Sequence, residues 1–130
     1  MNKLLELIEN AKNIAITGHV SPDGDCTGST LALYNYITEN FEGKQVRVCL
    51  EKPSMKFSYM NGFDLISEDP FLQADLLVSL DASDRERLGS RGVMLDTAKE
   101  SICIDHHVTN TKFAKFNIVE DFRSSTCELL

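Results

Sequence analysis

The chain reads IAITGHVSPDGD from Ile14 to Asp25, where a short apolar run stops and a histidine and two aspartates follow. The run is short enough to be a buried strand. The same arrangement occurs twice more, because apolar runs also precede the SLDASD of residues 79–84 and the DHH of residues 105–107. Stretches with helix-like pattern separate the three runs. This alternation predicts an α/β fold with a parallel sheet.

The polar segments are expected to meet at one edge of that sheet. The carboxyl ends of parallel strands lie along the same edge, and ligands bind in the crevice beyond them. The side chains there are carboxylates and imidazoles, which are ligands for Mn²⁺, Mg²⁺, Fe²⁺ or Zn²⁺, and the lack of thiolates argues against a structural zinc site. We therefore expect a metal site at the C-terminal edge of the strands.

The remaining pattern predicts helices on both faces of the sheet. Apolar spacing and turn residues give the expected elements: helices at 2–10, about 26–40 and about 93–99, and further strands at 46–50, 75–80, 101–104 and 116–119. No element is assigned to residues 54–70, where Asn61-Gly62 signals a turn.

Size and charge limit the function. With 130 residues the chain is long enough for one domain with its own core. The net charge of −7 argues against a large nucleic-acid surface on this segment alone, because phosphate contacts need clustered lysine and arginine. A phosphate substrate is still compatible with this charge, since metal ions can neutralise substrate and carboxylates together.

No targeting signal is recognisable in the sequence. Residues 1–12 form an amphipathic segment with Glu6 and Glu9 inside it, which is unlike a signal peptide, and no apolar run approaches the length of a membrane span. The four cysteines include no C-x-x-C pair, so no disulfide framework is indicated. We expect a cytoplasmic protein that does not span a membrane.

Two of the aspartate segments have alternative interpretations. In Asp23-Gly24-Asp25 each carboxylate could face one of two neighbouring ions, or the tripeptide could be a solvated turn in which Asp25 caps the next helix. Asp81 could bind a cation at the end of its buried strand, or it could cap the segment 83–88. The tripeptide by itself favours the turn, whereas the two roles of Asp81 are about equally favoured.

The pair His106-His107 is more specific. Adjacent residues after a strand point in different directions, so one ring could ligate a metal while the other reaches substrate. Asp105 is suited to fix the tautomer of a ligating histidine. A surface pair is the alternative, but the apolar run of residues 102–104 disfavours it. Arg85 and Arg87 could approach phosphate, although exposed arginines are usually solvated.

Together these segments resemble the DHH phosphoesterase family. The chain has H-x-x-P-D-G-D-x-x-G-S over residues 19–29, Leu80-Asp81 followed by RLG at 87–89, and the DHH of residues 105–107. Gly24 favours the branch of bacterial oligoribonucleases that also dephosphorylate pAp over the family II pyrophosphatases. The segment 124–130 looks like a helix start of the same branch, with S-x-x-E spacing at 125–128.

The resemblance implies a site for two metal ions. His19 and Asp23 would hold one ion, Asp25 and His106 the other, and Asp81 would bridge both. Ions roughly 3.5–4 Å apart can share a hydroxide nucleophile that attacks phosphorus and can stabilise the developing charge. Mn²⁺ is the ion that the family implies, with Mg²⁺ or Fe²⁺ as alternatives.

The resemblance also assigns catalytic roles and a domain. Besides Asp81, the expected catalytic residues are His107, beside the reacting phosphate, and Asp105, behind the histidines. Residues 1–130 would be a truncated DHH catalytic domain, without the C-terminal associated domain that binds substrate and without a further aspartate ligand. The full-length protein is expected to be a homodimer.

Several functions remain open at this point. The favoured one is hydrolysis of short oligoribonucleotides, pAp or both. The alternatives are a cyclic-dinucleotide phosphodiesterase, a polyphosphate or pyrophosphate hydrolase, and a regulatory module that binds nucleotides without turnover. A degenerate module would be expected to have lost motif residues. Because all five expected ligands are present, an enzyme is favoured.

Overall fold

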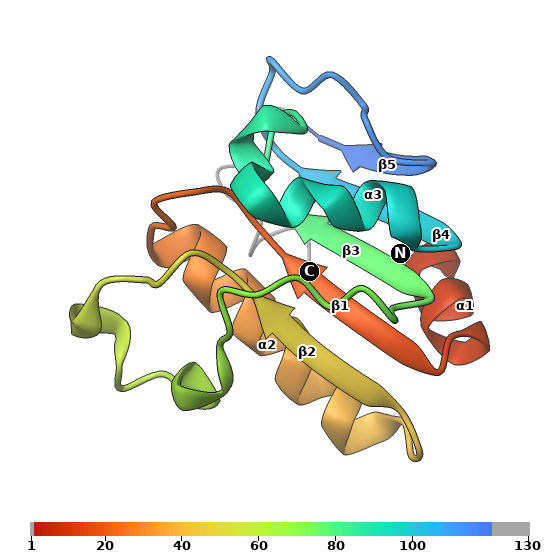
Figure 1. Cartoon of the computed structure of the whole chain (residues 1–130), viewed down its shortest axis with the longest axis horizontal. Helices are drawn as coiled ribbons and strands as arrows, with labels where there is room; N and C mark the ends of the chain where they lie inside the picture. Colours follow the sequence, from red (N-terminus) through yellow and green to blue (C-terminus); the bar gives the residue numbers. More distant parts are fainter. Residues whose placement is uncertain (1, 121–130) are drawn as a thin grey trace.

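The computed structural model describes residues 2–120 and has one sheet of five parallel strands (Figure 1). The strands are β1 (Asn13–Thr17), β2 (Gln45–Cys49), β3 (Leu76–Leu80), β4 (Glu100–Asp105) and β5 (Phe116–Val119), in the order β2-β1-β3-β4-β5. All four neighbouring pairs are parallel. The predicted α/β fold is confirmed, and each predicted strand lies within one residue of its observed bounds.

Helices cover both faces of the sheet. On one face, α1 (Asn2–Asn10) and α2 (Gly24–Asn40) contribute Leu7 and Ile37 to a core with Ile16, Val78 and Ile102 of the strands. Ile16, Val78 and Ile102 are register partners on neighbouring strands, so their side chains point to the same face of the sheet. Figure 1 shows α2 behind the sheet and α3 in front of it.

A smaller core lies on the opposite face. There η3, a 3-10 helix over Glu86–Val93, leads into α3 (Met94–Thr97), and Met94 packs with Phe71, Leu77 and Ala15. The predicted helix at 93–99 corresponds to α3, whereas η3 was not predicted. Residues 54–70 contain the short 3-10 helices η1 (Met55–Phe57) and η2 (Phe63–Leu65) and an isolated β-bridge between Ser67 and Cys49, in agreement with the irregular structure expected there.

The start of α2 differs from the prediction. The helix begins at Gly24, and its N-cap is Asp23, whose Oδ1 accepts the N–H of Cys26 at 2.9 Å. The alternative in which Asp25 caps this helix is therefore wrong. The shift occurs because Asp23 has the extended backbone of a cap residue, while Asp25 already belongs to the first turn.

The strand order reverses between β1 and β3, because β2 lies on one side of β1 and the later strands lie on the other. Loops that leave β1 and β3 therefore diverge and open a crevice at the carboxyl edge, the usual ligand site of such sheets. The S-x-x-E segment 125–128 lies outside the described residues. Within residues 2–120, no helix has the length and apolar character needed to cross a membrane.

Candidate metal and phosphate site

The strand ends bring the predicted site residues together. His19 follows β1, Asp81 directly follows β3, and the DHH tripeptide ends β4 and leaves it. Asp23 and Asp25 lie at the cap and first turn of α2. The seven residues that the sequence singled out come from four elements, and the contacts below place them in one cluster.

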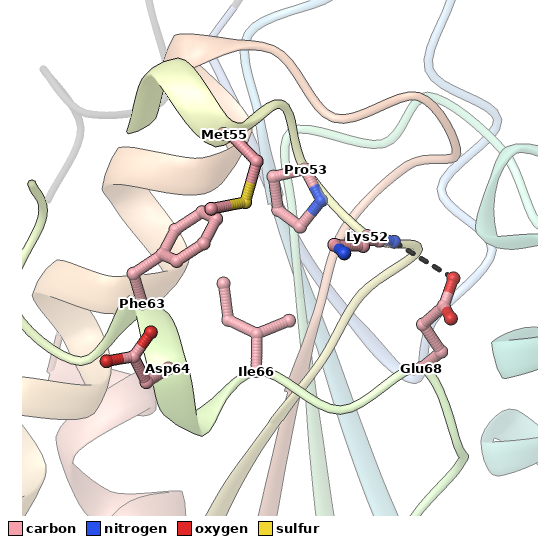
Figure 2. A pocket seen from close by; sticks show the side chains of 7 residues that line it. All are labelled: Lys52, Pro53, Met55, Phe63, Asp64, Ile66 and Glu68. Atoms are coloured by element: carbon pink, nitrogen blue, oxygen red, sulfur yellow. Dashed lines mark hydrogen bonds between the residues drawn. The ribbon is translucent and has the colours of Figure 1, made fainter. Parts of the chain in front are cut away.

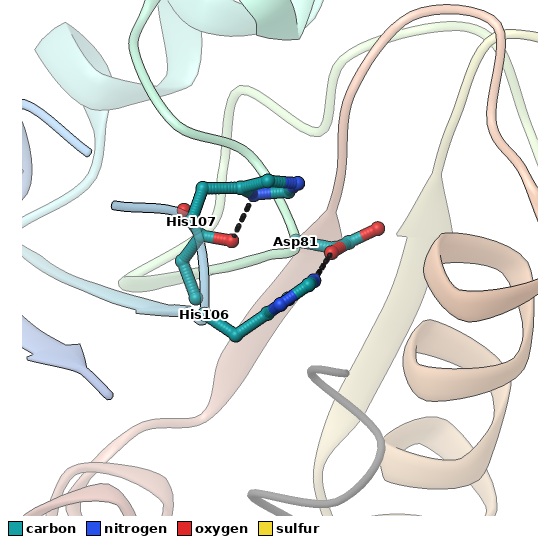
Figure 3. Close-up of side chains that lie close together, drawn as sticks. Asp81, His106 and His107 are labelled. Atoms are coloured by element: carbon teal, nitrogen blue, oxygen red, sulfur yellow. Dashed lines mark hydrogen bonds and ion pairs between the residues drawn. The ribbon is translucent and has the colours of Figure 1, made fainter. Parts of the chain in front are cut away.

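Asp81 is the centre of this cluster. Its Oδ2 lies 3.2 Å from Nε2 of His19 and its Oδ1 lies 3.3 Å from Nε2 of His106, so each carboxylate oxygen faces a different imidazole. Figure 3 shows the second of these contacts, with His107 alongside. The Asp81 side chain is only 2% exposed. Its φ of +62° lies in the left-handed region, which aspartate tolerates better than most residues but still at a cost.

A second aspartate approaches each imidazole. Oδ1 of Asp23 lies 3.6 Å from Nε2 of His19, and Oδ2 of Asp25 lies 3.5 Å from Nε2 of His106. The cluster thus has two halves, each with one imidazole nitrogen and two carboxylate oxygens, and Asp81 contributes one oxygen to each half. Nitrogen and oxygen donors that converge in this way match the ligand sets of divalent cations.

The backbone fixes which nitrogen of His19 faces the carboxylates. Nδ1 of His19 lies 2.7 Å from the carbonyl oxygen of Val20. Since a carbonyl oxygen only accepts, Nδ1 carries the proton of the neutral ring and donates it there. The lone pair is then on Nε2, which points at Asp81. This arrangement prepares His19 for binding a cation through Nε2.

Asp105 orients the other histidine. Nδ1 of His107 donates to Oδ1 of the fully buried Asp105 at 2.6 Å, and Oδ2 of Asp105 accepts from Nδ2 of Asn110 at 2.9 Å. The ligand atoms of Asp105 and His107 lie within 4.8 Å of those of Asp81 and His106. Because both oxygens of Asp105 already accept hydrogen bonds, this residue is better suited to position His107 than to bind an ion.

The electrostatics of the cluster favour a cation. Burial raises the pKa of Asp81, and the hydrogen bond that Nε2 of His19 donates when its ring is protonated opposes this effect only in part. The same hydrogen bond raises the pKa of His19. A buried carboxylate close to two further aspartates is costly to ionise, and positive charge between these groups would offset that cost.

Neighbouring loops support the loop that carries His19. Val20 donates its N–H to the carbonyl oxygen of Arg87 at 2.6 Å, and Ser21 donates its N–H to Oε1 of Glu51 at 2.8 Å. Asp84 accepts the N–H of Arg87 at 3.0 Å, which ties the start of η3 to the residues after β3. The His19 loop is therefore held from both neighbouring strand ends.

A cavity of about 350 Å³ opens over one half of the cluster. Its lining residues are His19, Asp23, Asp81, Ser83, Arg87 and His107. A second cavity, of about 380 Å³, lies beyond the end of β2 between Lys52 and Glu68, and Figure 2 shows its side chains. None of the predicted site residues lines this second cavity.

The sequence did not single out some residues that lie at the site. The thiol of Cys26 lies within 4.8 Å of donor atoms of His19 and Asp81, and burial raises its pKa, so it remains a neutral thiol. Asn110 was not predicted to contact Asp105, and Arg87 was not distinguished from Arg85. Cys26 directly follows Asp25, which was a usable signal, whereas nothing in the local sequence indicated the fold of the loop to Asn110.

Comparison with known proteins gives a consistent result. The model of the DHH family, N-terminal domain, matches residues 13–130. A bifunctional oligoribonuclease and PAP phosphatase NrnA of Mycoplasma genitalium is 30% identical over 131 residues, which cover 98% of this chain and 41% of the relative. A probable protein of the same name from Streptococcus mutans is 28% identical and is covered to 40%.

A solved structure is similar over nearly the whole chain. The crystal structure of an exopolyphosphatase-related protein from Bacteroides fragilis superposes with a TM-score of 0.89 at 29% identity, over 98% of this chain and 40% of that one. The chain therefore spans about two fifths of the length of these relatives.

Proposed function

Since this chain belongs to the DHH family, N-terminal domain, we propose that it is the catalytic part of a metal-dependent phosphoesterase that hydrolyses short oligoribonucleotides, pAp or both. The observation that carries the proposal is the position of Asp81, whose two oxygens face His19 and His106. The names of the relatives from Mycoplasma genitalium and Streptococcus mutans support these substrates.

The donor atoms fit two divalent cations. His19 and Asp23 would hold one cation, His106 and Asp25 the other, and Asp81 would contribute one oxygen to each. When bound, a pair of such cations would polarise the phosphoryl oxygens and lower the pKa of the attacking water. We propose Mn²⁺ as the ion, and hard oxygen and imidazole donors are also compatible with Mg²⁺ or Fe²⁺.

His107 has a separate role in this proposal. Its Nδ1 is held by Asp105, and the residue lines the cavity above the cluster. From there the His107 ring with protons on both nitrogens would donate a hydrogen bond from Nε2 to a phosphoryl oxygen on which negative charge develops. Asp105 acts as a positioning residue, because its hydrogen bond with Nδ1 fixes the orientation of the His107 ring.

Further features of the whole protein belong to the same proposal. Residues 1–130 would form the DHH catalytic domain, and substrate contacts would come in part from an associated domain. We also propose a homodimer for the full-length protein and a cytoplasmic location. The length of the relatives, of which this chain spans about two fifths, supports the presence of another domain in proteins of this type.

An activity assay tests the proposal. The purified protein is incubated with Mn²⁺ and one of four substrates: a 5′-phosphorylated RNA dinucleotide, pAp, a cyclic dinucleotide or polyphosphate. Hydrolysis of the dinucleotide or pAp that a chelator stops and Mn²⁺ restores is the expected result. Preferred hydrolysis of polyphosphate would instead favour a function like that in the name of the Bacteroides fragilis protein. If hydrolysis continued unchanged in the presence of the chelator, a metal-dependent mechanism would be contradicted.

The two adjacent histidines allow a sharper test of their roles. His106→Ala should lower Mn²⁺ affinity, because Nε2 of His106 faces Asp25 and Asp81. His107→Ala should keep the metal content and lower kcat, since this ring is held by Asp105 beside the cavity. The Mn²⁺ content and the kcat of both variants, measured side by side, test this difference. Equal metal loss in the two variants would contradict the separate roles.

A further inference from the structure

Among residues 2–120, Arg87 is the only lysine or arginine that lines the cavity over the cluster. The cavity otherwise presents His19, His107, Ser83 and two aspartates. A phosphate group that enters it would have to approach carboxylates, whose charge repels it unless cations neutralise them. Arg87 contributes a permanent positive charge from the protein itself. Its guanidinium also presents N–H donors in a fixed plane, which a metal cation does not.

The side chain of Arg87 is unpaired within the described part of the chain. It makes no hydrogen bond or ion pair with any residue in the range 2–120, although Asp23 and Asp81 line the same cavity. Arg85, two residues earlier, behaves differently, because its Nη1 and Nη2 donate to the two oxygens of Asp96 at 3.0 and 2.6 Å. One arginine is thus committed to a surface ion pair and the other is available at the cavity.

The backbone of Arg87 is fixed on both sides. Its N–H donates to Asp84 and its carbonyl oxygen accepts from Val20, next to His19. At Gly89, which has a φ of +61°, a Cβ would lie 2.7 Å from Cγ1 of Val20, so the two loops pack closely. The backbone from which the Arg87 side chain extends is therefore held beside the loop of His19, at the edge of the cavity.

We propose that Arg87 binds the two non-bridging oxygens of the phosphoryl group that is hydrolysed. This inference rests on the proposed function, since it places the reacting phosphate in the cavity between Arg87 and His107. The planar guanidinium donates two parallel N–H bonds to one phosphate, which holds the group in orientation as well as in place. Arg87 would be a substrate-binding residue, whereas Arg85 would have no part in the reaction.

The matched variants are Arg87→Ala, Arg87→Lys and Arg85→Ala. The substrate is the p-nitrophenyl ester of thymidine 5′-phosphate, a small diester that needs few contacts outside the cavity. For Arg87→Ala we expect kcat/KM to fall about 10- to 100-fold, the range for loss of a hydrogen bond to a charged group. Arg87→Lys should recover part of this loss, and Arg85→Ala should remain within about twofold of the parent protein.

Two further measurements separate a substrate contact from a structural role. Mn²⁺ content and the thermal unfolding midpoint of Arg87→Ala should match those of the parent protein. Inorganic phosphate should bind the Mn²⁺-loaded parent protein in a calorimetric titration and bind the Arg87→Ala variant at least about 10-fold more weakly. Unchanged phosphate affinity, or a loss of activity that follows a loss of Mn²⁺, would overturn the proposal.

The phosphate titration also keeps this inference distinct from the proposed function. If the parent protein binds phosphate through Arg87 but hydrolyses none of the substrates, the proposed function fails and the phosphate site stands. If the parent protein hydrolyses the diester and Arg87→Ala does so equally well, the proposed function stands and the role of Arg87 is wrong. A Mn²⁺-loaded parent protein that does not bind phosphate would also refute the site.

Discussion

The two ends of strand β3 carry aspartates in opposite environments. Asp75, just before the strand, is partly exposed, and its Oδ2 accepts the N–H groups of Lys12 and Asn13, each at 3.0 Å. These backbone hydrogen bonds lower its pKa. Asp81, just after the strand, is buried, and burial raises its pKa. Five residues of one strand separate the two carboxylates.

The difference separates stability from function. Asp75 accepts hydrogen bonds from two backbone N–H groups at the amino edge, and its own N–H donates to the carbonyl oxygen of Asn13 at 2.8 Å. Every one of these contacts stabilises the fold. Asp81 has a left-handed backbone, a buried charge and two further aspartates nearby. Unfavourable features collected at one residue are typical of functional sites, where a ligand compensates for them.

The largest effect is expected for the exchange of each aspartate for asparagine. Asp81→Asn should abolish hydrolysis, by about 1,000-fold or more, because it removes charge from both halves of the metal site at once. Asp75→Asn should leave kcat unchanged. Kinetics and Mn²⁺ titration on both variants check this. Turnover by Asp81→Asn near that of the parent protein at saturating Mn²⁺ would remove the distinction between the two ends of the strand.

Two glycines with positive φ extend the comparison to the loops of both edges. At the carboxyl edge, the Cβ of Gly89→Ala would lie 2.7 Å from Val20 and 2.9 Å from Nη2 of Arg91. At Gly43, before β2 at the amino edge, no heavy atom lies within 4 Å of the position that a Cβ would occupy. Overpacking and backbone strain together should cost Gly89→Ala about 2–4 kcal/mol of unfolding free energy. Gly43→Ala should cost only about 1–2 kcal/mol from its left-handed backbone.

The two glycine variants should also differ in catalytic activity. Gly89→Ala should also lower kcat/KM, because the displaced Val20 carries the carbonyl oxygen that holds His19. Gly43→Ala should keep the activity of the folded protein. Urea unfolding measures the first effect, and kinetics at a temperature where both variants are folded measure the second. Equal losses of activity would mean that the carboxyl-edge loop tolerates displacement.

The sequence predicted the strands and the edge at which the site lies, for a physical reason. Buried parallel strands need continuous apolar runs, and the residue after each run must be at the carboxyl edge. That logic located His19, Asp81 and the residues after β4. The start of α2 was misplaced because Asp23 and Asp25 are equally good cap residues by type, and only the backbone angles distinguish them.

Contacts between loops could not be predicted from the sequence. Arg85 and Arg87 have the same chemistry two positions apart, and their difference arises because Asp96 of α3 lies beside one and the cavity beside the other. Asn110 reaches Asp105 through a turn without periodic pattern. Such partners are set by tertiary packing, so they could be found only once the loops were placed relative to one another.

The smallest predicted effect concerns the pH dependence of stability at the amino edge. Because the pKa of Asp75 is lower in the folded chain than its ordinary value, the folded state favours the carboxylate. The resulting stability is fully present above the unfolded pKa, about 3.9, and is lost as the pH falls through the lower folded value.

Asp75→Asn keeps an oxygen acceptor but no charge, so it should be less stable than the parent protein by less than about 1 kcal/mol at pH 7. Urea unfolding of both proteins at pH 7, 5, 4 and 3 should show that the difference is constant down to about pH 5 and shrinks below about pH 4. A difference that grows on acidification would mean that the Asp75 carboxyl is not stabilised by its backbone donors, and the contrast with Asp81 would then rest on burial alone.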